Sequence, residues 1–231
     1  MTATKKNTVY IVIPAFNEQE VIRDVLNSLL QYPYTIVVVD DGSTPSLKEP
    51  LSDIHDITYI RHKVNLGQGA ALQTGIDYAL RHNADYIVTF DADGQHSPTD
   101  IEKLLTPLQN KEAAVALGSR FLEKNMHNAP ASRTWILKAG RWVNYFFTGL
   151  YLSDAHNGLR AMTREAAGKI HLKENRMAHA TEFLFLIRKH KLAYKEVPTV
   201  ILYTDYSKAK GQSVFNSIRI FFDLVLHKLF E

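Results

Sequence analysis

The chain has 231 residues, contains no cysteine and carries a formal net charge of +3. This length suits one domain with at most an appendage, and the lack of cysteine excludes disulfides, thiolate metal sites and a cysteine nucleophile. The charge is too mild to indicate a nucleic-acid partner. The only apolar run near the N-terminus, Val9–Ile13, ends at Pro14, unlike a signal peptide. No window offers roughly 18 uncharged apolar residues, so we expect no transmembrane helix and a cytoplasmic protein.

The first half of the chain alternates strand-like and helix-like segments. Short β-branched runs predict strands over residues 9–13, 35–39, 57–60, 86–90 and 113–117. A helical spacing of apolar side chains predicts helices over residues 18–30, 68–81 and 97–108, the last capped by Ser97 or Thr99. Strands separated by helices indicate an α/β, Rossmann-like fold, with a mainly parallel sheet and helices on both faces.

The second half is richer in aromatic residues and cations. Residues 163–170 and 181–190 predict helices, and residues 192–202 predict two strands broken near Pro198. Two further segments, 135–152 and 214–230, combine a narrow polar stripe with a wide apolar face. Helices at a membrane surface have this pattern, although core helices and dimer-forming helices show similar breadth.

Polar clusters directly follow three predicted strands, at residues 14–18, 40–43 and 91–95. Ligands of parallel sheets bind beyond the carboxyl ends of the strands, so the clusters should meet at one sheet edge. Asp91 and Asp93 can both face one Mg²⁺ or Mn²⁺, which also binds phosphate and water, and Gln95 or His96 could add a ligand. Such an ion can stabilise a departing nucleoside diphosphate. An ordinary strand-end loop is also rich in Asp and Gly, so this pair alone is a weak signal.

Three further motifs could bind the nucleotide or could serve only the fold. Asp41 could accept a hydrogen bond from a nucleoside, or it could make an Asx-type turn. Gly67 and Gly69 open the helix predicted at residue 68, where backbone amides could approach a nucleotide. The motif lacks the third glycine of the dinucleotide fingerprint and the Gly-Lys-Ser/Thr of a P-loop. Residues 14–18 could equally be a helix start with Asn17 as its cap.

Five motifs in order carry a family resemblance: Pro-Ala-Phe-Asn-Glu, Val-Asp-Asp-Gly-Ser, Asn-Leu-Gly-Gln-Gly-Ala, Asp-Ala-Asp-Gly-Gln-His and Gly-Ser-Arg-Phe. This series resembles family 2 of the glycosyltransferases, which has the GT-A fold, and within it the polyprenyl-phosphate (dolichyl-phosphate) sugar synthase branch. The resemblance covers roughly residues 8 to 213. It implies a GT-A domain over residues 1–213, with a nucleotide-sugar half (1–118) and an acceptor half (119–213), followed by an amphipathic helix over 214–231.

The resemblance also implies a role for each matching residue. The nucleotide-sugar site would comprise Pro14, Ala15, Asn17, Glu18, Asp41, Gly67, Gly69, Asp91, Ala92 and Asp93. Asp91, Asp93 and Gln95 would hold Mg²⁺ or Mn²⁺. The acceptor phosphate would meet Arg120, Arg133, Arg160, Lys210 and Ser213. The chain departs from the branch in having Lys208 and Lys210 where arginine is usual, and in lacking the transmembrane helices that many members carry after the catalytic domain.

The implied reaction is an inverting displacement at the anomeric carbon that moves a hexose from a UDP- or GDP-linked donor to a polyprenyl phosphate, at the inner face of the membrane. A hydroxyl acceptor on a saccharide or teichoic acid would need a general base, for which Asp154 and, as an alternative, Glu182 are candidates. A phosphate acceptor is already anionic and depends more on cations. A non-catalytic nucleotide-sugar binding module is a further alternative, and the oligomeric state stays open.

Overall fold

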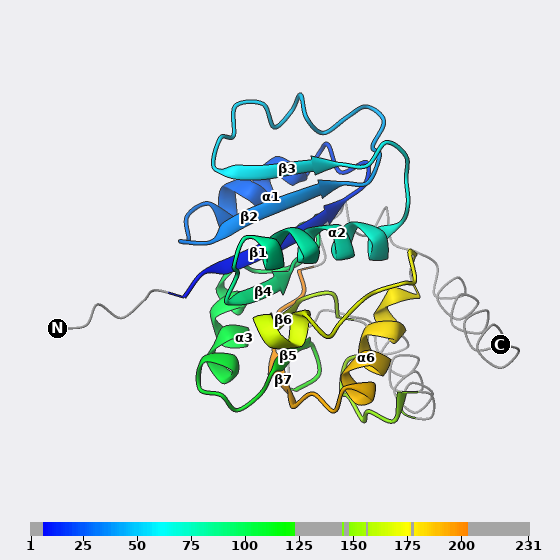
Figure 1. Ribbon diagram of the computed structural model, residues 1–231. Coiled ribbons are helices and arrows are strands. Elements are labelled where there is room, and N and C mark those ends of the chain that lie inside the picture. The colour runs from blue at the N-terminus through cyan, green and yellow to red at the C-terminus, as the bar shows by residue number, and fades with distance from the viewer. Residues whose placement is uncertain (1–6, 123–144, 146–147, 156, 177, 203–231) are drawn as a thin grey trace, which may run out of the picture.

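The computed structural model describes residues 7–122, 145, 148–155, 157–176 and 178–202 (Figure 1). Its centre is a seven-stranded sheet with the order β3-β2-β1-β4-β6-β5-β7. The strands are β1 (Val9–Ala15), β2 (Thr35–Asp40), β3 (Ile57–Arg61), β4 (Tyr86–Thr89), β5 (Val115–Ser119), β6 (Arg160–Thr163) and β7 (Tyr194–Pro198). The first four strands are parallel, β6 is antiparallel to both β4 and β5, and β7 is parallel to β5.

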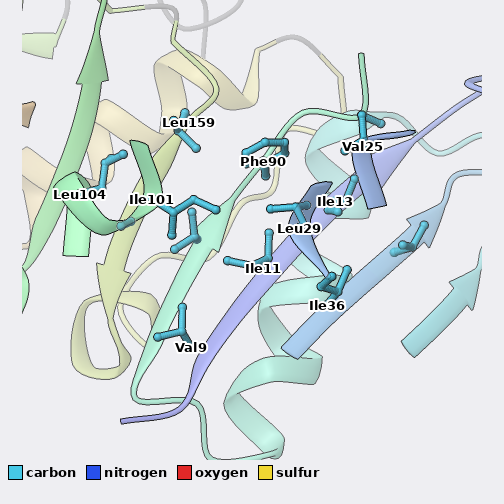
Figure 2. Close-up of a cluster of buried hydrophobic side chains, with 14 of the residues drawn as sticks. Val9, Ile11, Ile13, Val25, Leu29, Ile36, Phe90, Ile101, Leu104 and Leu159 are labelled. Atoms are coloured by element: carbon cyan, nitrogen blue, oxygen red, sulfur yellow. The ribbon is translucent and has the colours of Figure 1, made fainter. Parts of the chain in front are cut away.

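Helices cover both faces of the sheet, because side chains on a strand alternate between its faces. Ile11 and Ile13 of β1 point to one face, where they share a core with α1 (Ile22–Leu29) and α3 (Thr99–Gln109). Val12 points to the other face and shares a core with α2 (Gln68–Arg81), α5 (Arg164–Ala167) and α6 (His179–Lys189). Figure 2 shows the first of these cores. The predicted fold class, a mainly parallel sheet with helices on both faces, is confirmed.

Strand β6 is absent from the sequence prediction, which places a helix over residues 163–170. The structure pairs Thr89 of β4 with Arg160 and Val115 of β5 with Met162, so β6 fills the gap between the two halves of the sheet. A strand of four residues that is buried from both sides carries no readable periodicity. Thr163 then caps α5 by accepting a hydrogen bond from Ala166 N, and the helix ends at Ala167.

Several other element boundaries differ from the prediction, and three of them have a visible reason. The segment 192–202 contains one strand, β7, which ends at Pro198, and beyond it Ile201 makes only an isolated antiparallel bridge with His96. Helix α1 begins at Ile22, because the Glu18 carbonyl closes a turn by accepting from the amides of Val21 and Ile22. Helix α3 begins at Thr99, and neither of the two predicted caps, Ser97 and Thr99, bonds to its backbone amides. The hydroxyls of these two residues instead bond to each other at 2.7 Å.

The predicted helix over 214–231 and most of the predicted helix over 135–152 lie outside the described residues, as do Arg133, Lys210 and Ser213. Within the ranges that the structure does describe, no helix is both long enough and apolar enough to cross a membrane.

Candidate functional site

The loops after β1 and β2 meet at the carboxyl edge of the sheet, as the sequence predicts. Ala15 pairs with Asp40 in the strand register. Beyond this pair, Asn17 N donates to Ser43 Oγ at 2.9 Å, and Thr44 N donates to Asn17 Oδ1 at 2.9 Å. Asn17 adopts a positive φ of 56°, which asparagine tolerates better than most residues. Its side chain therefore joins two loops of the nucleotide half and does not cap α1.

Asp41 is buried, and its carboxylate holds the start of α2 against β2. Oδ1 accepts hydrogen bonds from His62 Nδ1 at 2.7 Å and from Leu66 N at 2.9 Å, and Oδ2 accepts from Gly67 N at 2.7 Å. Since a buried carboxylate is stable only when its oxygens have donors, these contacts explain why Asp41 can be buried there. A contact between Asp41 and a nucleoside stays a prediction.

The two glycine amides at the start of α2 donate to protein acceptors, Gly67 N to Asp41 and Gly69 N to Asn175, and a contact of these glycines with the nucleotide sugar stays a prediction. Gly69 N donates to the backbone carbonyl of Asn175 at 2.8 Å. A Cβ atom at residue 69 would lie 2.0 Å from Glu174 O, so only glycine allows this close packing. Glu182 fixes the same segment, because its carboxylate accepts from the amides of Lys173 and Glu174 at 2.9 to 3.1 Å. Glu182 thus has structural partners of its own.

Asp91 follows β4 and is held from two sides. Gln68 Nε2 donates to Oδ1 at 3.1 Å, and His96 Nε2 lies 3.0 Å from Oδ2. Burial alone would raise the pKa of Asp91, but the hydrogen bond from His96 and the electrostatic influence of His96, His179 and Arg160 outweigh it and lower that pKa. The carboxylate therefore stays ionised. Gln68 carries no signal of this contact in the sequence, because the two residues are 23 positions apart.

Asp93 shows the opposite perturbation. Burial and the negative charge of Asp91 raise its pKa to about 6. Its Oδ1 accepts a hydrogen bond from Gln95 N at 3.0 Å, so the predicted third ligand lies beside the pair. Two neighbouring carboxylates with surplus negative charge fit a hard divalent cation. Among the residues that the structure describes, no group of three or more acidic, histidine or cysteine side chains surrounds a single point, so phosphate and water oxygens would have to complete the coordination.

On the other side of β4, Asp154 and Arg120 form a buried bidentate pair. Arg120 Nε donates to Asp154 Oδ2 at 2.6 Å and Nη2 donates to Oδ1 at 2.7 Å, while the Arg120 amide adds a third bond at 3.1 Å. Arg120 follows directly after β5, so the pair lies beyond that strand. The Asp154 side chain is 2% exposed. Both of its oxygens are thus occupied by Arg120.

Arg160 lies between the two acidic regions and is buried. Its Nε donates to Asn157 O at 3.0 Å, and its guanidinium carbon lies 4.5 Å from the centre of the Phe183 ring. Burial lowers the pKa of Arg160 to about 10, although the negative charges of Asp91 and Asp154 oppose this change. The guanidinium is therefore cationic at neutral pH and electrostatically coupled to both carboxylates.

Gly158, which lies just before β6, allows the backbone there to pack directly against the Asp91 carboxylate. A Cβ atom there would lie 2.1 Å from Asp91 Oδ2. The Gly158 carbonyl in turn accepts from Thr89 Oγ1 at 2.7 Å, at the end of β4. The structure therefore unites Asp91, Asp93, Asp154 and Arg160 of the predicted site residues in one region, at the junction of β4 and β6. The sequence motifs alone do not indicate that these two segments touch.

Comparisons with known proteins identify a family for the chain. The family model described as glycosyl transferase family 2 matches residues 10–170. An uncharacterized protein of Methanocaldococcus jannaschii is 39% identical over 229 residues, covering 97% of this chain and 94% of the relative. The UDP-N-acetylglucosamine–dolichyl-phosphate N-acetylglucosaminyltransferase of Methanococcus voltae is 32% identical over 241 residues, covering 96% of each chain. Glucosyl-3-phosphoglycerate synthase from Mycobacterium tuberculosis, solved with Mn²⁺, UDP and glucosyl-3-phosphoglycerate, has the same fold, with a TM-score of 0.65 at 17% identity over 86% of this chain and 72% of that one.

Proposed function

Because the chain belongs to glycosyl transferase family 2, we propose that it transfers a hexose or N-acetylhexosamine from a nucleoside diphosphate sugar to a polyprenyl phosphate, with inversion at the anomeric carbon. The relative from Methanococcus voltae, whose name states a dolichyl-phosphate acceptor, supports this choice because it aligns along 96% of the chain. A place at the inner face of the membrane, with peripheral contact, belongs to the same proposal.

On the donor side, Asp91, Asp93 and Gln95 would hold Mg²⁺ or Mn²⁺. When bound, such an ion supplies positive charge to the leaving diphosphate. Gln68 and His96 keep the Asp91 carboxylate in one orientation, so the protein does not have to order it when the donor binds. Pro14, Ala15, Asn17, Glu18 and Asp41 would form or support the nucleoside pocket, and the rest of the nucleotide-sugar site would include Gly67, Gly69 and Ala92.

The observation that carries the acceptor assignment is the state of Asp154. A hydroxyl acceptor needs a nearby base with a lone pair to take its proton. Asp154 is bound by Arg120 through both oxygens, and Glu182 is bound by backbone amides, so both candidate bases already have hydrogen-bond partners, which disfavours proton abstraction by either. A phosphate acceptor is already anionic and instead needs cations that hold it. Arg120 and Arg160 would supply them, with Asp154 orienting Arg120, and Arg133, Lys210 and Ser213 would add further contacts.

The test is an acceptor comparison with purified protein and Mn²⁺ or Mg²⁺. Labelled UDP-N-acetylglucosamine, UDP-glucose and GDP-mannose are each offered with undecaprenyl phosphate and with undecaprenol, which has the same chain but no phosphate. We expect transfer to the lipid phosphate from one donor, and none to undecaprenol. Transfer to undecaprenol or to saccharides, with none to the phosphate, would overturn the acceptor assignment. Donor binding without transfer to any acceptor would favour a binding module.

A further inference from the structure

Glu196 makes the densest set of side-chain hydrogen bonds on the acceptor side, and no motif points to it. It lies on β7, where its strand position pairs with Leu117 of β5. Its Oε1 accepts from Ser153 N at 2.7 Å, Ser153 Oγ at 2.6 Å and Asp154 N at 3.2 Å, and its Oε2 accepts from Ser153 N at 3.0 Å. One carboxylate therefore fixes the backbone of the two residues that precede Ala155.

The hydroxyl groups next to Glu196 have one consistent direction of donation. A carboxylate can only accept, so the Ser153 hydroxyl donates to Glu196. The Ser119 hydroxyl, which contacts Ser153 Oγ, must then donate to it, and Ser119 Oγ accepts from Phe121 N at 3.2 Å. Each serine hydroxyl thus accepts one hydrogen bond and donates the next, and the series ends at the Glu196 carboxylate. It joins the end of β5 to the loop that carries Asp154.

Arg120 lies between the two ends of this arrangement. It directly follows Ser119, and its guanidinium is gripped by Asp154. Glu196 holds the Asp154 backbone, Asp154 holds the guanidinium, and the serine pair holds the residue before Arg120. We propose that Glu196 is a positioning residue for the acceptor: it sets the position of the Asp154–Arg120 pair and thereby the cation that meets the acceptor phosphate. This inference rests on the proposed function.

The decisive variant is Glu196→Gln, which keeps size and shape. Glutamine retains one oxygen acceptor but places an amide donor where Oε1 or Oε2 now accepts from N–H groups, so two donors would face each other. The Asp154 backbone should shift by a fraction of an ångström. Small displacements of an orienting group are costly for transfer, so we expect kcat/KM for undecaprenyl phosphate to fall roughly tenfold. Metal-dependent nucleotide affinity and slow hydrolysis of the donor should stay within about twofold of wild type, because no Glu196 contact reaches Asp91 or Asp93.

Glu112→Gln is the matched control. Glu112 forms an ion pair with Lys195, the neighbour of Glu196 on β7. This pair is exposed, and neither of its residues has a described hydrogen bond to Asp154. It should leave every readout unchanged. Equal losses of transfer and of nucleotide affinity in Glu196→Gln would indicate a general structural role and overturn the inference. Unchanged transfer in this variant would also overturn it. If the wild-type protein does not transfer sugar to polyprenyl phosphate, the proposed function itself is overturned. This is a separate result, given by the wild-type reaction that accompanies each variant.

Discussion

The two sides of the site are built in different ways. On the donor side, at the ends of β1, β2 and β4, the functional groups follow parallel strands, and two acids lie close together, so that burial and the negative charge of Asp91 raise the pKa of Asp93. On the acceptor side, around the end of β5, β6 and residues 153–157, the acid Asp154 is neutralised by Arg120 and a second arginine, Arg160, adds positive charge. This contrast supports the proposed placement of the metal ion on the first side and of the acceptor phosphate near the two arginines of the second.

The largest expected effect comes from Asp93→Asn. Asparagine keeps the shape but supplies a weaker, neutral ligand, so the donor side would lose its metal and transfer should fall by about 100-fold or more. Acceptor-side contacts should be intact, because Asp93 makes no described contact with Arg120 or Asp154. Turnover and calorimetric titration of UDP in the presence of Mn²⁺ measure the two consequences, loss of chemistry and loss of metal-dependent affinity.

Asp53→Asn is the control for this substitution. Asp53 forms an exposed ion pair with Arg23, neither residue has a described hydrogen bond to Asp91 or Asp93, and such exposed pairs contribute little. It should behave as wild type in both measurements. Wild-type turnover in Asp93→Asn would rule out the metal assignment. A lower melting temperature would indicate misfolding, whereas removal of the repulsion with Asp91 should leave the metal-free protein at least as stable.

A second substitution tests how the start of α2 packs against residues 174–175. Gly69→Ala places a Cβ atom 2.0 Å from Glu174 O and 2.8 Å from His179 Cβ, so backbone must move. Overpacking of this kind costs about 1–3 kcal/mol, more than the helix propensity that alanine gains. We expect the melting temperature to fall by roughly 2–10 °C, measured by thermal unfolding of the metal-free protein.

Gly168→Ala is the matched control, because its Cβ would meet only ordinary contacts at 3.5 and 3.7 Å, and its φ of −66° suits any residue. It should be neutral or slightly stabilising. If Gly69→Ala were as stable as wild type but bound nucleotide poorly, the glycine would serve the nucleotide, as the sequence suggests, and not the packing of residues 174–175.

The donor side is largely readable from the sequence for a physical reason. In a parallel sheet, residues that follow successive strands share one edge, so strand prediction alone places Asp41, Asp91 and Asp93 near each other. Their individual contacts are not readable. Asp41 turns toward the start of α2 and Gln68 reaches Asp91, and these orientations depend on how α2 packs against the sheet.

The acceptor side resists prediction because its contacts are long-range and its key strand is short. Strand β6 has four residues and no alternating pattern, so the antiparallel insertion between β4 and β5 is invisible in the sequence. The partners Arg120 and Asp154 are 34 positions apart, and Ser153 and Glu196 are 43 apart. The family resemblance predicts that Arg120 and Arg160 bind the acceptor phosphate. Only the folded chain shows that Arg120 binds both oxygens of Asp154 and that Glu196 accepts a hydrogen bond from the Asp154 amide.

The smallest expected effect concerns pH. The ordinary pKa of Asp93 is 3.8, and the fold raises it to about 6. Between these values the folded state binds more protons than the unfolded state, so this group lowers stability as pH rises from about 4 to about 6, and the penalty then persists at neutral pH. A divalent cation requires the ionised carboxylate, so one pH unit below the raised pKa its apparent affinity should be about tenfold weaker.

This competition predicts that the rise in melting temperature caused by saturating Mn²⁺ and UDP is roughly 3–5 °C smaller at about pH 5 than at about pH 7.5. Thermal unfolding with and without Mn²⁺ at the two pH values measures it, and Asp93→Asn should remove the difference. A metal-induced shift that is the same at both pH values would show that Asp93 does not bind the cation, and the division of charge between the two sides would then need another explanation.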